Sequence, residues 1–327
     1  MSGGFFLCIK QGFITFEIMY TNSNFSLTIL GNSAAIPTKQ SHLPSQLVIN
    51  KSDYFLVDCG EGTQMQLIRY KTKYHKIDNI FISHLHGDHF FGLIGLISTY
   101  HLLGRDKPLN IYGPELLQEL IEFQLVVTQT NLKYKLNFHH LHSETFNLVF
   151  ENKNIRVFSF PLVHRVPTWG FKFEQRPKKP NIKKSFVNKF NPSIEEMLNI
   201  IDGKDYTTNN DLVISNSEIT NQPLPPFSYA YCSDTRYDES ILKYITGTTV
   251  LYHEATFDNT MQELAQAKYH STAKDAATMA KNAKVSKLIL GHFSARNKEK
   301  SLLLDEATEV FKATIISEEG VEYTISQ

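Results

Sequence analysis

The sequence has no excess charge of either sign and few cysteines. Its 33 basic side chains balance 33 acidic ones, so no overall field attracts nucleic acid, and any such contact requires a local patch. The three cysteines, Cys8, Cys59 and Cys232, show no motif spacing. Their odd number argues against a disulfide framework and favours a reducing, cytoplasmic compartment. We expect Cys232, which lies within a strand pattern, to pack in the core.

The sequence also lacks long apolar runs and a recognisable leader. No run approaches the roughly 20 apolar residues that a membrane-spanning helix needs, so we expect no membrane partner. Residues 1–20 have neither a basic leading region nor a small-residue cleavage site, so a signal peptide is not expected. Regular patterning begins only at FSLTIL (25–30). We therefore treat residues 1–20 as an uncertain extension, with Met19 as an alternative start.

What remains is a chain well supplied with core-forming residues, because 42% of its 327 residues are hydrophobic. Alternating apolar runs bounded by turn residues predict strands at 25–30, 45–50, 54–60, 79–83, 109–113, 136–141, 145–151, 155–162, 169–175, 227–234, 248–255 and 287–292. Helical periodicity predicts helices at 62–71, 90–103, 114–127, 272–283 and 301–312. Strand clusters in both halves, each followed by helices, indicate an α/β fold with two packed sheets and helices outside.

One stretch, residues 176–226, departs from this pattern. It is polar and rich in Lys, Asn and Pro, and its one helical signal is SIEEMLNII (193–201). We expect residues 21–327 to form one domain that carries this stretch as an insertion or protruding arm.

The stretch FISHLHGDHFFG (81–92) carries the strongest chemical signal. His84 and His86 alternate along an extended loop after a strand and can face one metal ion. Asp88 and His89 enter the next helix and can face a second ion, and Gly87 lets the backbone bend between the pairs. Imidazole and carboxylate ligands suit zinc or a similar divalent ion, whose charge removes their mutual repulsion.

Four ligands cannot complete two metal shells, so further ligands are expected at other strand ends. His164, Asp234 and His292 each follow a predicted strand, and a carboxylate such as that of Asp234 could bridge both ions. The run HHLH (139–142) is different, because it lies within a strand pattern without a turn. We interpret its histidines, His139, His140 and His142, as edge or surface residues.

Taken together, these motifs resemble the metallo-β-lactamase superfamily, and specifically its ribonuclease Z branch. The resemblance rests on LVDCGEGTQMQLIR before the metal motif, ISHLHGDHFFGL, HEAT at 253–256, HST at 270–272 and HFSARN at 292–297. It extends from about residue 25 to 312, nearly the whole chain.

The resemblance implies an αββα metallo-β-lactamase sandwich with two zinc ions per subunit. The implied ligands are His84, His86 and His164 for one ion and Asp88, His89 and His292 for the other, with Asp234 shared. The implied reaction removes the 3′ trailer from precursor tRNA by attack of a metal-bridging hydroxide, leaving a 3′-hydroxyl on the tRNA. Asp88 would orient or deprotonate the water, and His270, supported by Glu254, would protonate the departing oxygen. A homodimer is also implied.

The family's arm binds tRNA, and the basic run at the start of the insertion is the corresponding candidate here. Its cations are Arg176, Lys178, Lys179, Lys183, Lys184 and Lys189. A solvated, disordered loop would have the same composition. The arm lacks the Gly-Pro element typical of the family. PTKQSHLPS (37–45) also replaces the usual Arg-Asn pair, so that Lys39 or His42 would take the place of the arginine.

Two other functions fit parts of the sequence. A phosphodiesterase of the same superfamily could act on small or cyclic esters, in which case the arm would be dispensable. A non-catalytic RNA-binding relative would have lost its metals, but all seven candidate ligands and His270 are present, which argues against that function.

Overall fold

The computed structural model describes residues 25–326 except 143–144, 222, 224 and 297–298. Contacts divide the chain into two compact units, one made of residues up to 174 together with 227 onward and the other of residues 175–226. We call the first the main unit and the second the arm. The uncertain extension 1–20 and Cys8 lie outside the described residues.

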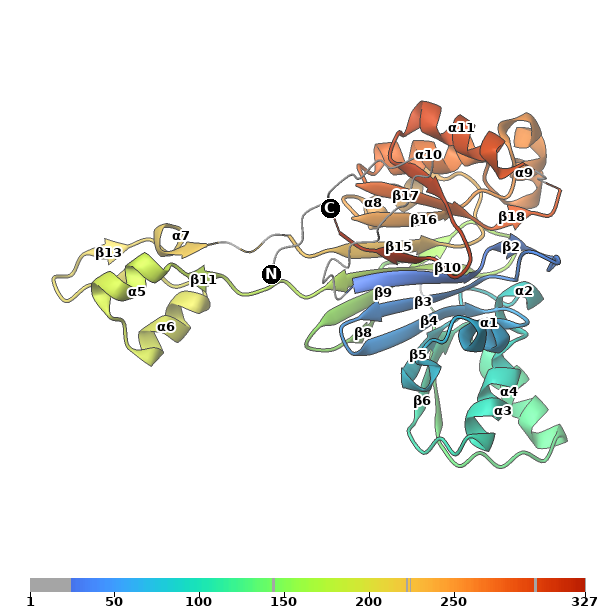
Figure 1. The fold of residues 1–327 in the computed structure, drawn as a ribbon, viewed down its shortest axis with the longest axis horizontal. Coiled ribbons are helices and arrows are strands. Elements are labelled where there is room, and N and C mark those ends of the chain that lie inside the picture. Colours follow the sequence, from blue (N-terminus) through green and yellow to red (C-terminus); the bar gives the residue numbers. More distant parts are fainter. Residues whose placement is uncertain (1–24, 143–144, 222, 224, 297–298, 327) are drawn as a thin grey trace, which may run out of the picture. The chain divides into compact units, whose positions relative to one another are not determined.

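The main unit contains two seven-stranded sheets (Figure 1). The first has the order β20-β1-β3-β4-β5-β6-β7, and its strands are β1 (Phe25–Gly31), β3 (Ser45–Asn50), β4 (Asp53–Cys59), β5 (Ile77–Phe81), β6 (Leu109–Gly113), β7 (Leu136–His140) and β20 (Glu322–Thr324). The second has the order β19-β17-β16-β15-β10-β9-β8, and its strands are β8 (Asn147–Glu151), β9 (Ile155–Leu162), β10 (Thr168–Gln175), β15 (Ser228–Cys232), β16 (Val250–Glu254), β17 (Lys287–Gly291) and β19 (Thr314–Ile316). A short parallel pair, β2 (Ser33–Ala34) with β18 (Phe293–Ser294), lies apart from both sheets.

Side chains alternate between two cores along each central strand, as a sheet covered on both faces requires. In β4, Phe55 and Val57 belong to the core between the sheets, whereas Leu56 belongs to the core under the helices of the first sheet. In β16, Tyr252 faces the core between the sheets and Leu251 faces the helices of the second sheet. The result is an αββα sandwich, which confirms the fold class expected from the sequence.

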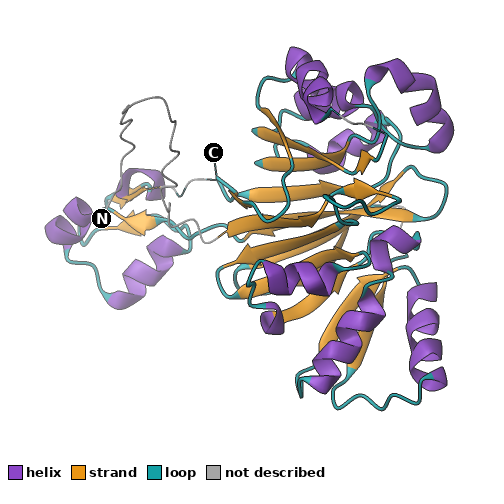
Figure 2. Ribbon diagram, turned by 45° about the vertical axis from the view of Figure 1, so that its right-hand side comes forward, coloured by secondary structure: helices purple, strands orange, loops and turns teal. Residues whose placement is uncertain are grey.

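Helices cover the outer face of each sheet (Figure 2). Those associated with the first sheet are α1 (Thr63–Arg69), the 3₁₀ turn η1 (Tyr74–Lys76), α2 (Gly87–Phe90), α3 (Leu93–Leu102) and α4 (Leu116–Val127). Those associated with the second are η2 (Glu239–Ile241), α8 (Leu242–Ile245), η3 (Asn259–Met261), α9 (Gln262–Lys268), α10 (Ala273–Asn282) and α11 (Lys300–Val310). Among the described residues, no helix is long and apolar enough to cross a membrane.

The arm folds around a small core of its own. Its elements are β11 (Asn181–Ile182), α5 (Lys184–Phe190), α6 (Ile194–Ile201), β12 (Tyr206–Thr207), β13 (Val213–Ile214), α7 (Asn216–Ile219) and β14 (Thr220–Asn221). Phe186, Ile200, Tyr206 and Ile219 are its buried apolar residues. Ser193 forms a capping box with Glu196 at the start of α6, which is the helix that the sequence predicted.

Most expected elements of the main unit are present within a few residues, but the sequence missed several short ones. The three-residue strands β19 and β20 are too short for an alternating pattern to be read. The arm helices α5 and α7 were also missed, since polar residues dominate them. Asn191, in the left-handed conformation, ends α5 where the sequence offers no glycine.

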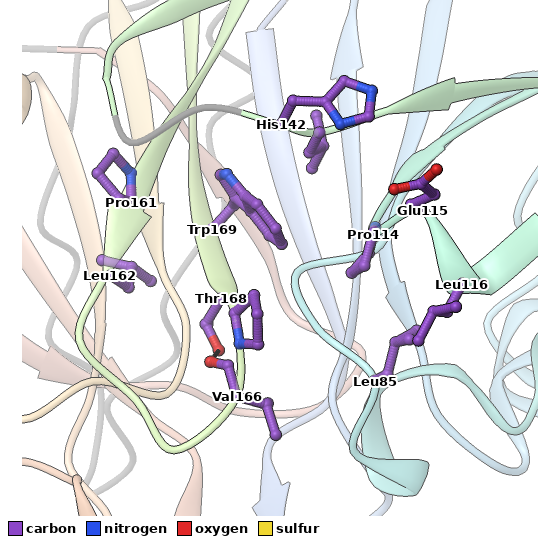
Figure 3. A pocket seen from close by; sticks show the side chains of 12 residues that line it. Leu85, Pro114, Glu115, Leu116, His142, Pro161, Leu162, Val166, Thr168 and Trp169 are labelled. Atoms are coloured by element: carbon purple, nitrogen blue, oxygen red, sulfur yellow. Dashed lines mark hydrogen bonds between the residues drawn. The ribbon is translucent and has the colours of Figure 1, made fainter.

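An apolar pocket of about 700 Å³ opens beside the loop that follows β5 (Figure 3). Leu85, Leu116, Leu162 and Trp169 are among its lining residues. Leu85 lies between His84 and His86 in the sequence, so the loop that forms one wall of this pocket also carries candidate metal ligands.

Candidate metal centre

The candidate ligands meet because parallel strands end at one edge of the sandwich. β15, β16 and β17 are mutually parallel, and their ends deliver Asp234, Glu254 and His292 to the same edge. His84 and His86 follow β5. His86 has extended backbone angles and precedes α2, in whose first turn Asp88 and His89 lie.

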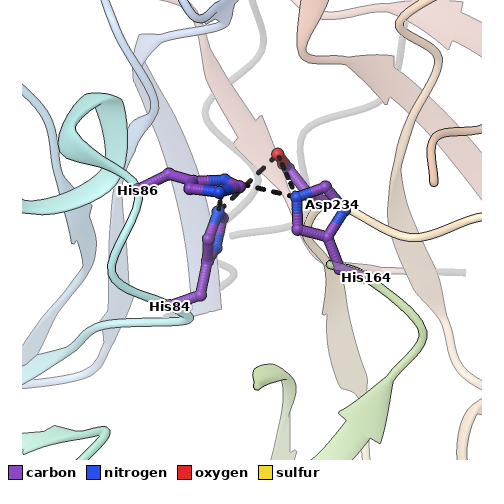
Figure 4. A group of neighbouring side chains, drawn as sticks. All are labelled: His84, His86, His164 and Asp234. Carbon is purple, nitrogen blue, oxygen red and sulfur yellow. Dashed lines mark hydrogen bonds and ion pairs between the residues drawn. The ribbon is translucent and has the colours of Figure 1, made fainter. Parts of the chain in front are cut away.

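Four side chains form the first group (Figure 4). The Nδ1 atom of His86 lies 3.0 Å from Nε2 of His84 and 3.2 Å from Nε2 of His164. The Oδ2 atom of Asp234 lies 3.7 Å from Nε2 of His84 and 3.8 Å from Nε2 of His164. One ligand atom from each residue therefore faces a common point.

The second group surrounds the other oxygen of the same aspartate. Oδ1 of Asp234 lies 3.3 Å from Nε2 of His89 and 3.1 Å from Nε2 of His292. Oδ2 of Asp88 completes the group at 3.6 Å from Nε2 of His89 and 3.8 Å from Nε2 of His292. Asp234 thus presents one oxygen to each group, the arrangement of a bridging carboxylate.

The donor set fits divalent metal ions. Around an ion with bonds of about 2.0–2.1 Å, tetrahedral ligand atoms lie roughly 3.3 Å apart, close to the separations seen here. Three of these buried atoms, Nε2 of His89, Nε2 of His292 and Oδ1 of Asp234, have no hydrogen-bond partner among the described residues. Buried polar atoms without partners are costly, and a bound cation would satisfy all three.

A residue that the sequence analysis did not single out, Asp58 in β4, orients the second group. Its fully buried carboxylate lies 2.7 Å from Nδ1 of His89 and accepts hydrogen bonds from the backbone N–H of Ser83 and the hydroxyl of Tyr231. Such carboxylate contacts fix the tautomer of a ligand histidine and leave Nε2 free for metal. The available signal was a lone Asp within the otherwise apolar strand YFLVDCG.

Similar contacts fix three other histidines of the two groups. Nδ1 of His164 donates to the carbonyl oxygen of Tyr269 at 2.8 Å. Nδ1 of His292 lies 2.9 Å from the hydroxyl of Thr256, a residue of HEAT. Nδ1 of His84 lies 3.0 Å from the hydroxyl of Ser83. Each of these three rings is therefore held with Nε2 directed to the centre.

His270 and Glu254 form an ion pair beside the two groups. Nδ1 of His270 lies 2.7 Å from Oε1 of Glu254, a fully buried carboxylate. Burial by itself would lower the pKa of His270, but the charge and hydrogen bond of Glu254 outweigh it and raise the pKa to about 9. Backbone N–H groups of Thr235 and Thr256 also donate to Glu254. The imidazole is thus kept protonated at neutral pH.

The centre opens into a cleft of about 700 Å³. His86, Asp88, Asp234, His270 and His292 line it, so both groups and His270 share one opening. Its other lining residues include three exposed cations, Arg165, Lys268 and Arg296, and one exposed carboxylate, Glu61. Apolar residues also line it, namely Ile36, Phe91, Phe257 and Leu264.

The remaining predicted residues lie outside the centre. His42 is held by Glu319, which bonds both its backbone N–H and its Nδ1, whereas Lys39 is exposed. His139 and His140 lie on the edge strand β7, and no HHLH histidine joins a metal group within the described residues. Cys232 is buried in the core of the second sheet.

The basic residues of the arm are partly engaged within the arm. Lys179 pairs with Asp202 at 2.7 Å, with both side chains largely exposed. The ammonium group of Lys183 donates to a backbone carbonyl at 2.6 Å. Lys178, Lys184 and Lys189 are exposed, and Arg176 is half-buried.

Known proteins share both the fold and the sequence. Human tRNase Z, short form, superposes with a TM-score of 0.67 at 26% identity, covering 92% of this chain and 100% of that one. The metallo-β-lactamase fold protein YhfI of Bacillus subtilis superposes with a TM-score of 0.65 at 18% identity, over 91% of this chain and 98% of that one. A family model described as anti-Pycsar protein Apyc1 matches residues 25–176.

The sequence relatives are more specific. Ribonuclease Z of Bacteroides thetaiotaomicron is 42% identical over 302 residues, covering 92% of this chain and 96% of that protein. Ribonuclease Z of Cytophaga hutchinsonii is 42% identical over 304 residues, covering 93% and 97%. The fold and its His/Asp centre define a metal-binding hydrolase of the metallo-β-lactamase fold. Within that class, the chain belongs to the ribonuclease Z family.

Proposed function

We propose that the protein is a zinc-dependent endoribonuclease that removes the 3′ trailer from precursor tRNA in the cytoplasm. The observation that carries this proposal is the shared carboxylate, because Asp234 directs one oxygen to each group of ligands. Membership of the ribonuclease Z family supports the choice of substrate. The buried His270–Glu254 pair adds the proton donor that phosphodiester hydrolysis needs.

The ligand set proposed for two zinc ions follows the two groups. His84, His86 and His164 would hold one ion, Asp88, His89 and His292 the other, and Asp234 both. Nitrogen-rich sets with carboxylates are typical of zinc. Two such ions would supply Lewis-acid activation of a water at neutral pH.

The protein's own side chains would then position and move protons. Asp88 is fixed by the backbone N–H of Ala35, which donates to Oδ2 at 2.9 Å, so its carboxylate can orient the attacking water. His270, protonated beside Glu254, would donate its proton to the departing ribose oxygen. The products are a 3′-hydroxyl on the tRNA and a 5′-phosphate on the trailer.

The arm is proposed to bind tRNA through its basic residues. Its exposed lysines, among them Lys178, Lys184 and Lys189, suit phosphate contacts that do not read sequence. Arg176, Lys179 and Lys183 complete the proposed set. Since Lys179 pairs with Asp202 only at the surface, that weak ion pair can exchange for a phosphate.

A homodimer is proposed on the exposed face of α4. Leu116, Leu120, Phe123 and Val127 repeat at helical spacing and are 41–68% exposed. An apolar face of this kind is expected to be covered by another surface, and we propose a second copy of the chain. Sedimentation equilibrium should give twice the chain mass for the parent and a monomer for Phe123→Glu.

Incubation of purified protein with precursor tRNA tests the activity directly. Mapping the product's 3′ end should locate the cut after the acceptor stem, and a chelator should abolish the cut until zinc is restored. Elemental analysis should find about two zinc ions per chain. Hydrolysis of small cyclic esters with no cleavage of precursor tRNA would overturn the proposal.

A further inference from the structure

We infer that Phe91 is a stacking platform for a nucleobase next to the scissile phosphate, and that Arg165 binds a neighbouring backbone phosphate. This inference deepens the proposed function and rests on it. Both residues line the cleft that contains the metal centre, and neither belongs to the ligand set.

Phe91 is exposed yet closely packed on one side. It follows α2 directly and is 62% exposed. Its ring lies against the backbone of Gly87, where an added Cβ would come within 2.1 Å of a ring atom. Gly87 separates the ligands His86 and Asp88 in the sequence. The ring is therefore held on the metal-binding loop by the absence of a side chain at Gly87, while much of its surface remains open.

A single exposed phenylalanine is common on protein surfaces, so its exposure alone does not indicate a binding site. The charged residues that line the same cleft supply the further evidence. Arg165, Lys268 and Arg296 are exposed, line the same cleft and form no ion pair within the described residues. Arg165 immediately follows the ligand His164.

An aromatic face beside exposed cations matches single-stranded nucleic acid. Bases stack on aromatic rings with little regard to sequence, and cations follow the phosphates. An enzyme that cuts many transcripts at one structural position needs this sequence-tolerant hold. Fixing one base beside the cut would also align the phosphodiester with the metal centre, and a fixed geometry of this kind accelerates the reaction.

The test compares variants that keep or remove the aromatic face. Phe91→Leu should lower kcat/KM for precursor tRNA by roughly tenfold to a hundredfold, the range of base–aromatic stacking, whereas Phe91→Trp should restore it. Zinc content and thermal unfolding of both variants should match the parent. Leu102→Ala, which removes an exposed apolar side chain 82% exposed at the end of α3, should leave kcat/KM unchanged.

Substrates that each carry one abasic nucleotide near the cut identify the stacked base. At one position, removing the base should lower kcat/KM of the parent enzyme by the same factor as Phe91→Leu lowers it on the intact substrate. On that abasic substrate, Phe91→Leu should cause no further loss of kcat/KM. Arg165→Gln should weaken binding of every substrate and reduce its salt dependence. If Phe91→Leu cut all substrates like the parent, or lost the same factor on every abasic substrate, the platform would be refuted. No cleavage of precursor tRNA by the parent would overturn the proposed function itself.

Discussion

The metal centre and the arm are built in opposite ways. The centre lies in the main unit on the ends of buried strands, and its candidate ligands His84, His89, Asp234 and His292 are at most 3% exposed. The arm has only short elements around four buried apolar side chains, and most of its lysines are exposed. One region holds its side chains in a packed interior, whereas the other presents exposed charges.

This difference shows how catalysis and substrate binding can be divided between the two regions. Catalysis requires side chains to be fixed within a fraction of an ångström, which packed strands and outer hydrogen bonds such as Asp58–His89 provide. Binding a large polyanion requires only charge and reach. Loss of a residue in the centre should therefore abolish chemistry, and loss of the arm should weaken substrate binding alone.

The largest effect is expected from Asp234→Ala. Because this carboxylate faces both groups, its removal should reduce zinc content at both sites and abolish cleavage. Elemental analysis and a precursor tRNA assay would measure this. Asp106→Ala, an exposed aspartate on the same unit, is the control. Full occupancy of both ions in Asp234→Ala would refute the bridging assignment.

His270→Ala should separate chemistry from metal binding. Glu254 keeps three other hydrogen bonds, from Thr235 and from the backbone and hydroxyl of Thr256, so the site should retain zinc. Turnover should fall by about a hundredfold or more, the usual effect of removing a general acid. The exposed His75→Ala serves as control. Turnover within a few-fold of the parent would reduce His270 to a structural role.

Excision of the arm should have the converse effect. β10 pairs antiparallel with β15, with Glu174 opposite Ser228, so residues 176–226 can be replaced by an Asn-Gly hairpin turn. Zinc content and hydrolysis of a small phosphodiester should persist, while precursor tRNA binding weakens greatly. A truncated protein that bound and cut precursor tRNA like the parent would make the arm passive and favour the small-ester function.

Glu254→Gln should produce a smaller, pH-dependent effect. Glu254 raises the pKa of His270 to about 9, so the protonated donor persists through neutral pH. Without that charge the pKa of His270 should fall towards its ordinary 6.5. As the pH rises, the variant should therefore lose activity at a lower pH than the parent does. A pH–rate profile of parent and variant would show this shift. An alkaline limb at the same pH in both would contradict the pairing.

The smallest effect is expected from neutralising single arm lysines. Lys184→Gln and Lys189→Gln should each weaken binding of all precursor tRNAs alike. Each should also reduce the slope of log K against log salt by about 0.7–0.9 if that lysine contacts a phosphate. Lys51→Gln, in the turn between β3 and β4, is the matched control. Filter-binding titrations over a range of salt concentrations would measure these slopes.

The sequence predicted long elements well and short or polar ones poorly. The alternation in strands such as β4 and β16 was readable because both faces of each strand are covered by apolar cores. The helices α5 and α7 were not readable, because only Phe186 and Ile219 are buried in them. Asp58 was missed for another reason. Its partner His89 is 31 positions away, and no local pattern reveals such a contact.

The sequence by itself determined that this protein can bind metal ions, because the spacing of His84, His86, Asp88 and His89 on one loop is a local property. The backbone places such neighbours together whatever the rest of the chain does. Only the tertiary structure decided that Asp234 faces both groups of side chains and that Glu254 raises the pKa of His270. These contacts join strand ends far apart in the chain, and parallel pairing of β15, β16 and β17 brings them to one edge.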